Sequence, residues 1–593
     1  MKKYFIYILL IISSFSFAQN QQLAKKYFED GDFEKAATEY RLLLDKFPYN
    51  TIYLENLIQA YQKAGNFKAV DELVKKKRLN KKPQFMVWLG YNYFLQKDSI
   101  RAKKYFEKAI NQAVNKNYYV YQTGNAFQKI YRLDEAIELY EKAMKKNPKQ
   151  NFYLQIAQLY AQKNQPGKMM SNYLKLIEQR PRYEMQIRYY LTPYIKQYSD
   201  YSTNETIKKV LIETIKQKPL PAYYRLLEWL YVQQKDYRKA FFQLRSLYKK
   251  NEADISQIYQ LANTAVANKK PEHARTIYQY LIKQIDEPEY VEKSKLALLK
   301  MDTKKILSEE KKQEINTKFQ TYLQEKWLML NHIRLQIQYA DFLAFHQNKT
   351  DDALDILNDL LSKSLSRRLQ AEVQMKKADI LMFNGYFNQA LILYTQVQLD
   401  FPNNQTGHLA TYKIARASFF KGDIDWAHNQ LKVIKSVHSD LISNDAIDLD
   451  LIIVNNKEES DSTQTALKKF AKIKFDIFKK DYQSALQSLD SMKQNYKGQL
   501  IYDDVLWTQA QIYEQINRFD DALADYQEIL NNKTEDLFVD DAIFRMAKIY
   551  ENQKDDEEKA KKLYKKIIVE FPASYWFTDA QQAFRRLRGD KKT

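Results

Sequence analysis

The sequence predicts an all-α protein in which helical hairpins stack into one long solenoid. The chain of 593 residues contains only 10 Gly and 12 Pro, so the residues that interrupt helices are rare. Its apolar residues recur at helical rather than alternating spacing. A set of residues also returns with a period near 34, which favours a repeat array over several globular domains.

One unit of the array is visible in residues 27–48, YFEDGDFEKAATEYRLLLDKFP. Gly31 interrupts a first amphipathic helix. In the helix that follows, Ala36, Tyr40 and Leu43 share one face at i, i+4 and i+7. Pro48 ends this helix because proline lacks the amide hydrogen that the helical ladder needs. The stretch therefore predicts a helix–turn–helix unit.

The same residues return along the chain. Those at 31, 33, 36, 40 and 48 have identical counterparts 354 residues later, at 385, 387, 390, 394 and 402. The small residue of the second helix first recurs at steps of 34, 32, 34 and 33 residues, and two gaps of 71 and 79 residues each leave room for a degenerate copy. These small-residue anchors are Ala36, Val70, Ala102, Ala136, Met169, Ala240, Ala274, Ala353, Ala390, Ala427, Ala485, Ala522 and Ala560.

This order of small, aromatic, Gly, aromatic, Ala, Tyr and Pro residues resembles the tetratricopeptide repeat. The resemblance covers roughly residues 20–590 and departs locally, as where Val70 and Met169 replace the expected Ala. It implies a right-handed α-solenoid of about 13–15 helix–turn–helix units. The 46 Tyr residues fit such stacking if each ring lies between helices and its hydroxyl reaches water at the rim.

Four segments are predicted. They are a signal peptide at 1–18, a basic N-terminal array at 19–300, a middle section at 301–455, and a C-terminal array with longer repeats and a basic cap at 456–593. The middle section is expected to open with a long helix over 308–330 that begins at Ser308. The polar stretch 455–463 is the predicted joint before the last array.

The N-terminus has the pattern of a secretory signal peptide. Lys2 and Lys3 precede an apolar run over 4–17, and Ser16 and Ala18 are placed for cleavage after Ala18. A single transmembrane anchor is the alternative, although the run is short and contains serines. The chain contains no Cys, which excludes a lipid-anchored cysteine, disulfides and thiolate metal sites. We therefore expect an exported protein that does not span the membrane, in the periplasm or peripheral to the outer membrane.

The net charge of +21 is concentrated in one stretch. Residues 51–250 hold 38 Lys and Arg against 16 Asp and Glu, whereas residues 251–593 hold 49 against 51. One interpretation is that runs such as 75–82, KKKRLNKK, are solvated helix ends. The other is a basic face for an acidic partner. In an exported protein this partner would be an acidic protein segment, peptidoglycan or lipid headgroups rather than nucleic acid.

Asp residues open the predicted first helices of the last array. Asp503–Asp504 and Asp540–Asp541 are two such pairs, and Asp445 marks a matching helix start before the joint. We expect these carboxylates to cap free backbone amides and to complement the helix dipole. They are therefore interpreted as structural and not as an acid/base pair or a calcium site.

Residues 539–589 resemble a subset of repeats in periplasmic proteins of bacterial envelope assembly. These are the Tol–Pal-associated coordinator and the lipoprotein subunit of the outer-membrane barrel-assembly machine. The resemblance rests on the Asp-led helix, the turn at 571–574 and the closing helix with Ala580, Phe584 and Leu587. The absence of Cys departs from the lipoprotein subunit.

No arrangement of residues in the sequence predicts catalysis. The six His residues have no metal-ligand spacing, and the chain has no nucleophile elbow and no Gly-rich phosphate loop. The protein is therefore expected to be no enzyme and to hold no cofactor or metal.

The remaining prediction concerns recognition. The family resemblance implies that the first helix of each hairpin lines a concave groove for extended or helical peptides. We expect an exported scaffold or adaptor that binds envelope proteins during outer-membrane or secretion-complex assembly. The alternative is a module in which the basic half binds peptidoglycan or an anionic glycan. The residues that the resemblance places in the groove of the basic half are Tyr91, Asn125, Lys129, Gln158, Arg225 and Trp229.

Overall fold

The computed structural model describes residues 21–196, 201–304, 307–325, 332–435, 441–457, 464–531 and 538–589. Helices joined by turns make up this part of the chain, and it contains no strand. The prediction of an all-α solenoid of helical hairpins is confirmed. Over the same residues, no helix has both the length and the apolar character needed to cross a bilayer.

The chain divides into two compact units, Met1–Asp286 and Glu287–Thr593. The predicted signal peptide at 1–18 lies outside the described residues, as do residues 458–463 of the predicted joint. The predicted segment limits at 300 and 455 remain predictions.

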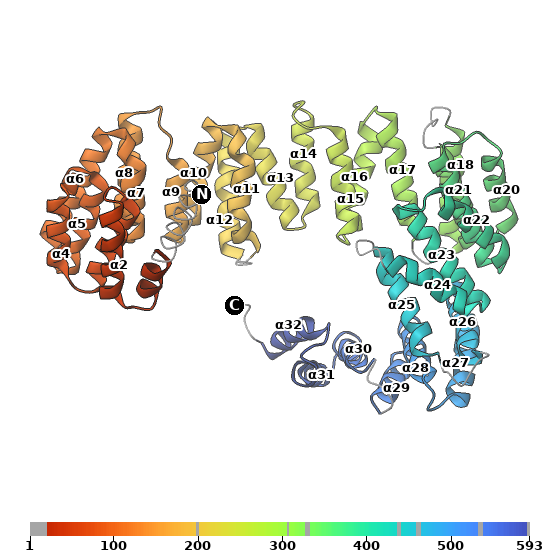
Figure 1. Cartoon of the computed structure of the whole chain (residues 1–593). Helices are drawn as coiled ribbons and strands as arrows, with labels where there is room; N and C mark the ends of the chain where they lie inside the picture. Colours follow the sequence, from red (N-terminus) through yellow and green to blue (C-terminus); the bar gives the residue numbers. More distant parts are fainter. Residues whose placement is uncertain are drawn as a thin grey trace, which may run out of the picture. The chain divides into compact units, whose positions relative to one another are not determined.

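Unit 1 is a series of hairpins in which neighbouring helices stand side by side (Figure 1). Residues 21–29 are helical and pair with the second helix α2 (Phe33–Lys46). The later first helices are α3 (Thr51–Lys63), α5 (Pro83–Leu95), α7 (Val120–Lys129), α9 (Tyr153–Gln162), α11 (Glu184–Lys196), α13 (Pro221–Gln233) and α15 (Ile255–Ala267). Their second helices are α4 (Phe67–Lys76), α6 (Ser99–Asn115), α8 (Leu133–Lys146), α10 (Pro166–Gln179), α12 (Tyr201–Gln217), α14 (Tyr237–Tyr248) and α16 (Pro271–Gln284).

Unit 2 continues the same architecture with longer helices. Its first part contains α17 (Pro288–Asp302), α18 (Glu309–Gln324), α19 (His332–His346), α20 (Thr350–Leu361), α21 (Arg367–Phe383), α22 (Phe387–Asp400), α23 (Gln405–Lys421), α24 (Ile424–Lys435) and α25 (Leu441–Asn455). Its second part contains α26 (Thr465–Phe478), α27 (Tyr482–Asn495), α28 (Ile501–Gln515), α29 (Phe519–Asn531), α30 (Val539–Asn552), α31 (Glu557–Glu570) and α32 (Phe577–Arg588).

The recurring Gly and Ala residues have the structural roles that the sequence predicts. Gly31 and Gly385 lie in the turns between first and second helices, with φ of +85° and +82°, a conformation that glycine adopts without strain. Ala36 and Ala390 have no exposed surface, because their small side chains lie where packed helices approach closely. The segment 180–207, which lacks these residues, still forms α11 and the start of α12.

The recurring Tyr residues are more deeply buried than predicted. Tyr394 has no exposed surface, and its hydroxyl donates to the Asp379 carboxylate at 2.6 Å rather than to water at the rim. Tyr564 donates to Glu551 in the same way at 2.8 Å, and Tyr278 donates to Asn263 at 2.6 Å. The partner lies on the preceding first helix in each case, so the hydroxyl joins the two helices of one hairpin. The expectation failed because a ring deep in the hairpin keeps its hydroxyl out of water, and a buried hydroxyl needs a protein partner.

The helix starts of unit 2 agree only partly with the sequence predictions. Ser308 does begin α18, where its hydroxyl accepts from the Lys311 amide at 3.3 Å. The predicted extent to 330 is wrong, because α18 ends at Gln324 and the backbone of Glu325 is extended. Asp503 and Asp504 are not N-caps, because they lie inside the first turn of α28, a position that still complements the helix dipole as predicted. Asp445 is also not a cap, because it lies within α25 rather than at its start.

Candidate functional site

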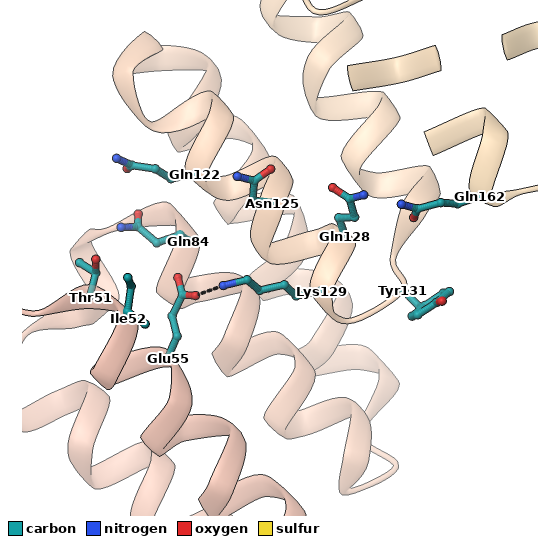
Figure 2. Close-up of a pocket in the computed structure, with 10 residues that line it drawn as sticks. All are labelled: Thr51, Ile52, Glu55, Gln84, Gln122, Asn125, Gln128, Lys129, Tyr131 and Gln162. Atoms are coloured by element: carbon teal, nitrogen blue, oxygen red, sulfur yellow. Dashed lines mark hydrogen bonds and ion pairs between the residues drawn. The ribbon is translucent and has the colours of Figure 1, made fainter. Parts of the chain in front are cut away.

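Two adjoining cavities lie on unit 1, and the first helices of consecutive hairpins supply most of their lining. The first, which we name the amide pocket, has a volume of about 570 Å³. Figure 2 shows its residues, which come from four first helices and one turn. They are Thr51, Ile52 and Glu55 of α3, Gln84 of α5, Gln122, Asn125, Gln128 and Lys129 of α7, Tyr131, and Gln162 of α9.

Helix α7 contributes the largest share of this lining, four of the ten residues, because of its spacing. Gln122, Asn125 and Gln128 follow one another at intervals of three, so they lie along one helical face. The opposite face of α7 carries Ala126 and Phe127, which are 2% and 0% exposed in the core. Burial of the apolar face therefore turns the amide face toward the pocket.

The amide pocket is balanced in charge. Its two charged lining residues, Glu55 and Lys129, form an ion pair that joins α3 to α7 (Figure 2). The Glu55 side chain is 14% exposed and the Lys129 side chain is 51% exposed. The cations that make unit 1 basic therefore do not make this pocket basic.

Several polar side chains of the pocket can still form hydrogen bonds with a ligand. Gln84 is 5% exposed, and its side-chain oxygen Oε1 accepts no hydrogen bond within the described part of the chain. The amides of Gln122, Asn125 and Gln128 likewise make no side-chain hydrogen bond to another described residue. A buried amide oxygen without a partner is costly, by about 1–3 kcal/mol, and a bound ligand or water that donates to it removes that cost.

The second cavity, which we name the tyrosine pocket, has a volume of about 990 Å³. It shares Gln128 and Gln162 with the amide pocket, so the two cavities form one continuous groove. None of its lining residues carries a formal charge at neutral pH. The lining residues are Gln128, Gln158, Ala161, Gln162, Asn164, Tyr173, Tyr189, Tyr190, Thr192, Pro193, Tyr194 and Thr203.

The tyrosines of this pocket range from buried to exposed. Tyr173 is 2% exposed, and its burial raises the pKa of its hydroxyl above the usual value. The Tyr190 ring stacks on that of Tyr173, with ring centroids 6.3 Å apart, and its hydroxyl accepts from Gln186 at 2.9 Å. Tyr189 is 75% exposed. The pocket thus offers aromatic faces together with uncharged hydrogen-bonding groups.

Three of the six predicted binding residues line this groove. Asn125 and Lys129 lie in the amide pocket, and Gln158 lies in the tyrosine pocket. Tyr91 is on the first helix α5, where its half-buried ring stacks on Phe94 with centroids 6.1 Å apart. It does not line either pocket.

The other two predicted residues lie on α13, away from both pockets. The Arg225 guanidinium donates to Glu184 at 2.9 Å and to Glu252 at 3.5 Å, so its charge is already balanced. Trp229 is half-buried on the same helix. The structure therefore brings Asn125, Lys129 and Gln158 together and leaves Tyr91, Arg225 and Trp229 elsewhere.

Sequence reasoning missed most of the amides in the groove. Gln122 and Gln128 lie three residues on either side of Asn125, and Gln162 lies four residues after Gln158. These intervals place them on the same helical faces as the predicted residues. Extending the lining along each face would have identified them, but Gln84 would have remained hidden because the rest of α5 is largely buried.

The groove provides hydrogen bonds and aromatic surface but no evident catalytic set. Among the described residues, no group of three or more His, Cys, Asp or Glu could hold a metal ion.

Models of the tetratricopeptide repeat match three parts of the chain. The matched residues are 83–113 and 151–183 in unit 1 and 541–574 in unit 2. They correspond to the hairpins α5–α6, α9–α10 and α30–α31. Among curated proteins, no sequence matches this chain.

Several solved structures are similar over long stretches. Naa15/Naa10 bound to HypK-THB is 11% identical over 97% of this chain and 94% of its own, with a TM-score of 0.27. The human IFIT1 dimer with m7Gppp-AAAA is 11% identical over 74% of this chain and 90% of its own, with a TM-score of 0.29.

A tetratricopeptide repeat protein from Parabacteroides merdae is 12% identical over 50% of this chain and 99% of its own, with a TM-score of 0.21. Such low scores transfer no function. The recurring residues, the stacked hairpins and the matched models nevertheless agree, and the three matched segments are tetratricopeptide repeats.

Proposed function

We propose that this protein is an exported scaffold that binds another envelope protein, and that the groove of unit 1 holds an extended segment of that partner. The observation that carries the proposal is the row of amide side chains that three consecutive first helices, α5, α7 and α9, place along one groove. Repeats of this superfamily typically serve protein–protein interaction and not catalysis, and we propose no enzymatic activity for this chain.

The chemistry of the groove favours main-chain recognition. An amide side chain offers one acceptor and two donors, which match the N–H and C=O groups of an extended peptide. Gln84 has a buried acceptor available, and Gln122, Asn125 and Gln128 follow it along the pocket. Each hydrogen bond contributes about 0.5–1.5 kcal/mol, so a row of them is needed for useful affinity. Ile52, which is 62% exposed, adds an apolar contact at the rim.

Export and an envelope role rest on the sequence alone. The basic and apolar pattern over 2–18 supports export, and residues 539–589 resemble repeats of periplasmic assembly proteins. We propose that the partner takes part in outer-membrane or secretion-complex assembly. The division of the chain into two units leaves room for a second partner on unit 2.

The test is crosslinking in the native cell followed by mass spectrometry. A photo-crosslinking side chain replaces Gln128, which both pockets share, in the full chain. The matched control places the same side chain at Asn111, an exposed amide on the second helix α6. We expect one envelope protein to be captured from position 128 and not from position 111. Capture of the same proteins from both positions contradicts the proposal.

A second candidate function is the binding of a cell-wall glycan. The specific observation is the tyrosine pocket, where aromatic faces and amides occur without formal charge, a combination that suits sugar rings and their hydroxyls. Sedimentation with purified sacculi distinguishes the two candidates. If Tyr189→Ala abolishes sedimentation, the glycan function is supported. If the protein stays in the supernatant, the glycan function fails and the protein partner stands.

A further inference from the structure

The links between successive hairpins of unit 1 all lie on one edge of the array. Each link joins the C-terminal end of a second helix to the next first helix, and the second helices run in the same direction because the hairpins stack in register. Four consecutive links, at 75–82, 115–119, 145–152 and 179–184, form the surface that we name the link edge.

The link edge is strongly basic. Its four links hold 12 Lys and Arg but only one carboxylate, that of Glu184. Glu184 is 6% exposed and is already paired with Arg188 and Arg225. The cations include Lys75, Lys81, Lys145 and Lys149, all exposed. Among the described residues, none of these four forms an ion pair with a carboxylate.

Stabilisation of helix ends does not account for this concentration. Cations in the last turn of a helix complement its dipole, which explains Lys75 and Lys145. However, Lys149 lies beyond the helix ends, and Lys81 ends only a single turn of 3-10 helix, Leu79–Lys81. The equivalent links of unit 2, at 361–367, 399–405, 495–501 and 570–577, hold three cations and two carboxylates, although their helices have the same dipoles. One of those cations, Arg367, is paired with Asp400.

The opposite edge of unit 1 also differs from the link edge. There the turns join first helices to second helices, and the four turns at 63–67, 95–99, 129–133 and 162–166 hold five Lys and Arg against one carboxylate. Arg101 pairs with Asp98, and Arg132 pairs with Glu135 at 3.3 Å. Lys163 pairs with Asp134. The unbalanced positive charge of unit 1 is therefore denser on its link edge than on the opposite edge.

Exposed aromatic and apolar side chains are interspersed with these cations. Tyr118, in the second of the four links, is 67% exposed. Tyr49, in the preceding link at 47–50, is 91% exposed, and Met185 directly after the last link is 78% exposed. Tyrosine favours the boundary between water and lipid, where its ring is buried and its hydroxyl stays hydrated.

We propose that the link edge of unit 1 binds the surface of an anionic phospholipid bilayer. The cations are spread over several repeats, and none of them lines the amide pocket or the tyrosine pocket, so the edge suits an extended charged surface better than a discrete ligand. Each Lys near such a surface contributes about 1 kcal/mol at physiological ionic strength. The exposed tyrosines insert their rings into the bilayer at the level of the lipid headgroups. This inference is independent of what the groove binds.

The experiment is flotation of residues 19–593 with vesicles, because the predicted signal peptide would itself bind lipid. One set of vesicles contains phosphatidylglycerol and phosphatidylcholine in equal parts, and the other contains phosphatidylcholine alone. We expect binding to the anionic vesicles only, with at least a tenfold loss between about 0.05 and 0.5 M salt. Equal binding to both sets, or no binding to either set, overturns the proposal.

Matched variants locate the binding surface. The test variant replaces Lys75, Lys77, Lys81, Lys145 and Lys149 by Gln. The control replaces the same number of exposed Lys residues on the opposite edge or its turns, at Lys63, Lys68, Lys97, Lys235 and Lys269. We expect the test variant to lose binding by roughly tenfold or more and the control by less than threefold. Equal losses overturn the assignment to the link edge.

A third variant separates lipid from other anionic material. Tyr49→Ser with Tyr118→Ser leaves the charge unchanged, and we expect several-fold weaker vesicle binding with unaltered binding to soluble polyglutamate. If polyglutamate binds as tightly as the vesicles and both tyrosines are neutral for vesicle binding, the partner is an acidic polymer and the bilayer proposal fails.

Discussion

The two units of the chain use the same hairpin but differ in the partners of the polar side chains on their first helices. In unit 1, Gln122, Asn125 and Gln128 face a groove and have no side-chain partner among the described residues. In unit 2, the corresponding helices are joined by their own polar groups. Asp379 of α21 accepts from Lys413 of α23 at 2.5 Å and from Tyr394 at 2.6 Å.

This pairing continues through unit 2. Lys376 of α21 pairs with Asp341 of α19, and Arg334 donates twice to Glu372 at 3.0 Å. Burial alone would raise the pKa of Asp379, but Lys413 and Lys376 hold it below its usual value. Ion pairs therefore join the first helices α19, α21 and α23, whereas the amides of α7 in unit 1 retain capacity for a ligand.

Aromatic packing also differs between the two units. In unit 2 the C-terminal ends of α21, α23 and α26 meet the N-terminal end of α22 in a group of phenylalanines. Phe475 contacts Phe387 and Phe420 at centroid distances of 5.0 and 5.5 Å, and Phe478 contacts Phe383 at 6.0 Å. The tyrosine pocket of unit 1 instead leaves Tyr189 exposed. The recurring Gly, Ala, Tyr and Pro residues determine the hairpin. The residues between them determine whether the polar side chains of a surface are paired within the protein or available to a ligand.

The strongest test of this comparison is Asp379→Ala. Removing the carboxylate leaves Lys413 and Lys376 without their shared partner in a site where the Lys413 side chain is only 15% exposed. We expect the free energy of unfolding of unit 2 to fall by about 3–5 kcal/mol, as for other broken buried ion pairs. Chemical denaturation of the full chain measures it. The control is Asp400→Ala, whose pair with Arg367 is exposed, and a loss there of comparable size would contradict the interpretation.

Gly124→Ala tests the packing of a unit 1 hairpin. A Cβ at this position would lie 2.2 Å from the buried hydroxyl oxygen of Tyr140, which has little room to move. We expect a loss of about 2 kcal/mol from overpacking, read as a lower denaturation midpoint of unit 1. Gly31→Ala, where the new Cβ meets open space at a φ of +85°, should cost only about 1 kcal/mol. An equal or larger loss at Gly31 would contradict the expected overpacking at Gly124.

The pH dependence of unit 2 depends on Asp504. Burial raises the pKa of this carboxyl from 3.8 to about 6, against a hydrogen bond from Asn456 and the charge of Lys474. Between these pH values the folded state therefore keeps the carboxyl protonated where the unfolded chain has released its proton. The contribution of this proton to the free energy of unfolding is fully present below about pH 4 and is lost as the pH rises through 6.

Asp504→Asn provides the measurement. The free energy of unfolding of the wild type minus that of the variant should fall by roughly 1–2 kcal/mol between about pH 4 and pH 7, because only the wild type titrates at this position. Urea denaturation at several pH values gives this difference. A difference that stays constant, or that grows with pH, would exclude a raised pKa for Asp504.

The smallest expected effect is in the groove. Replacing Gln122, Asn125 and Gln128 together by Ala removes no internal hydrogen bond, so each change should alter the free energy of unfolding by less than about 0.5 kcal/mol. The same variant should weaken partner capture at the groove at least tenfold. A large loss of stability would mean that these amides are structural, as the polar residues of unit 2 are.

Part of the candidate site could be predicted from the sequence. Repeat position places Asn125, Lys129 and Gln158 in the groove, and they do line it. The same rule selects Arg225, but Glu184 and Glu252 occupy its guanidinium. Repeat position fixes the helix face of a residue, whereas its partners come from helices that stack beside it.

The sequence by itself determined the hairpin, its period and the small and aromatic residues of the core. Helical periodicity, glycine turns and small residues act over a few neighbouring positions. Only the tertiary structure decided which polar side chains are satisfied. Lys129 forms an ion pair with Glu55, 74 residues earlier in the chain, and Lys413 forms one with Asp379, 34 residues earlier. Such pairs form only when stacked hairpins bring distant helices together, and this stacking separates the open groove of unit 1 from the internally paired helices of unit 2.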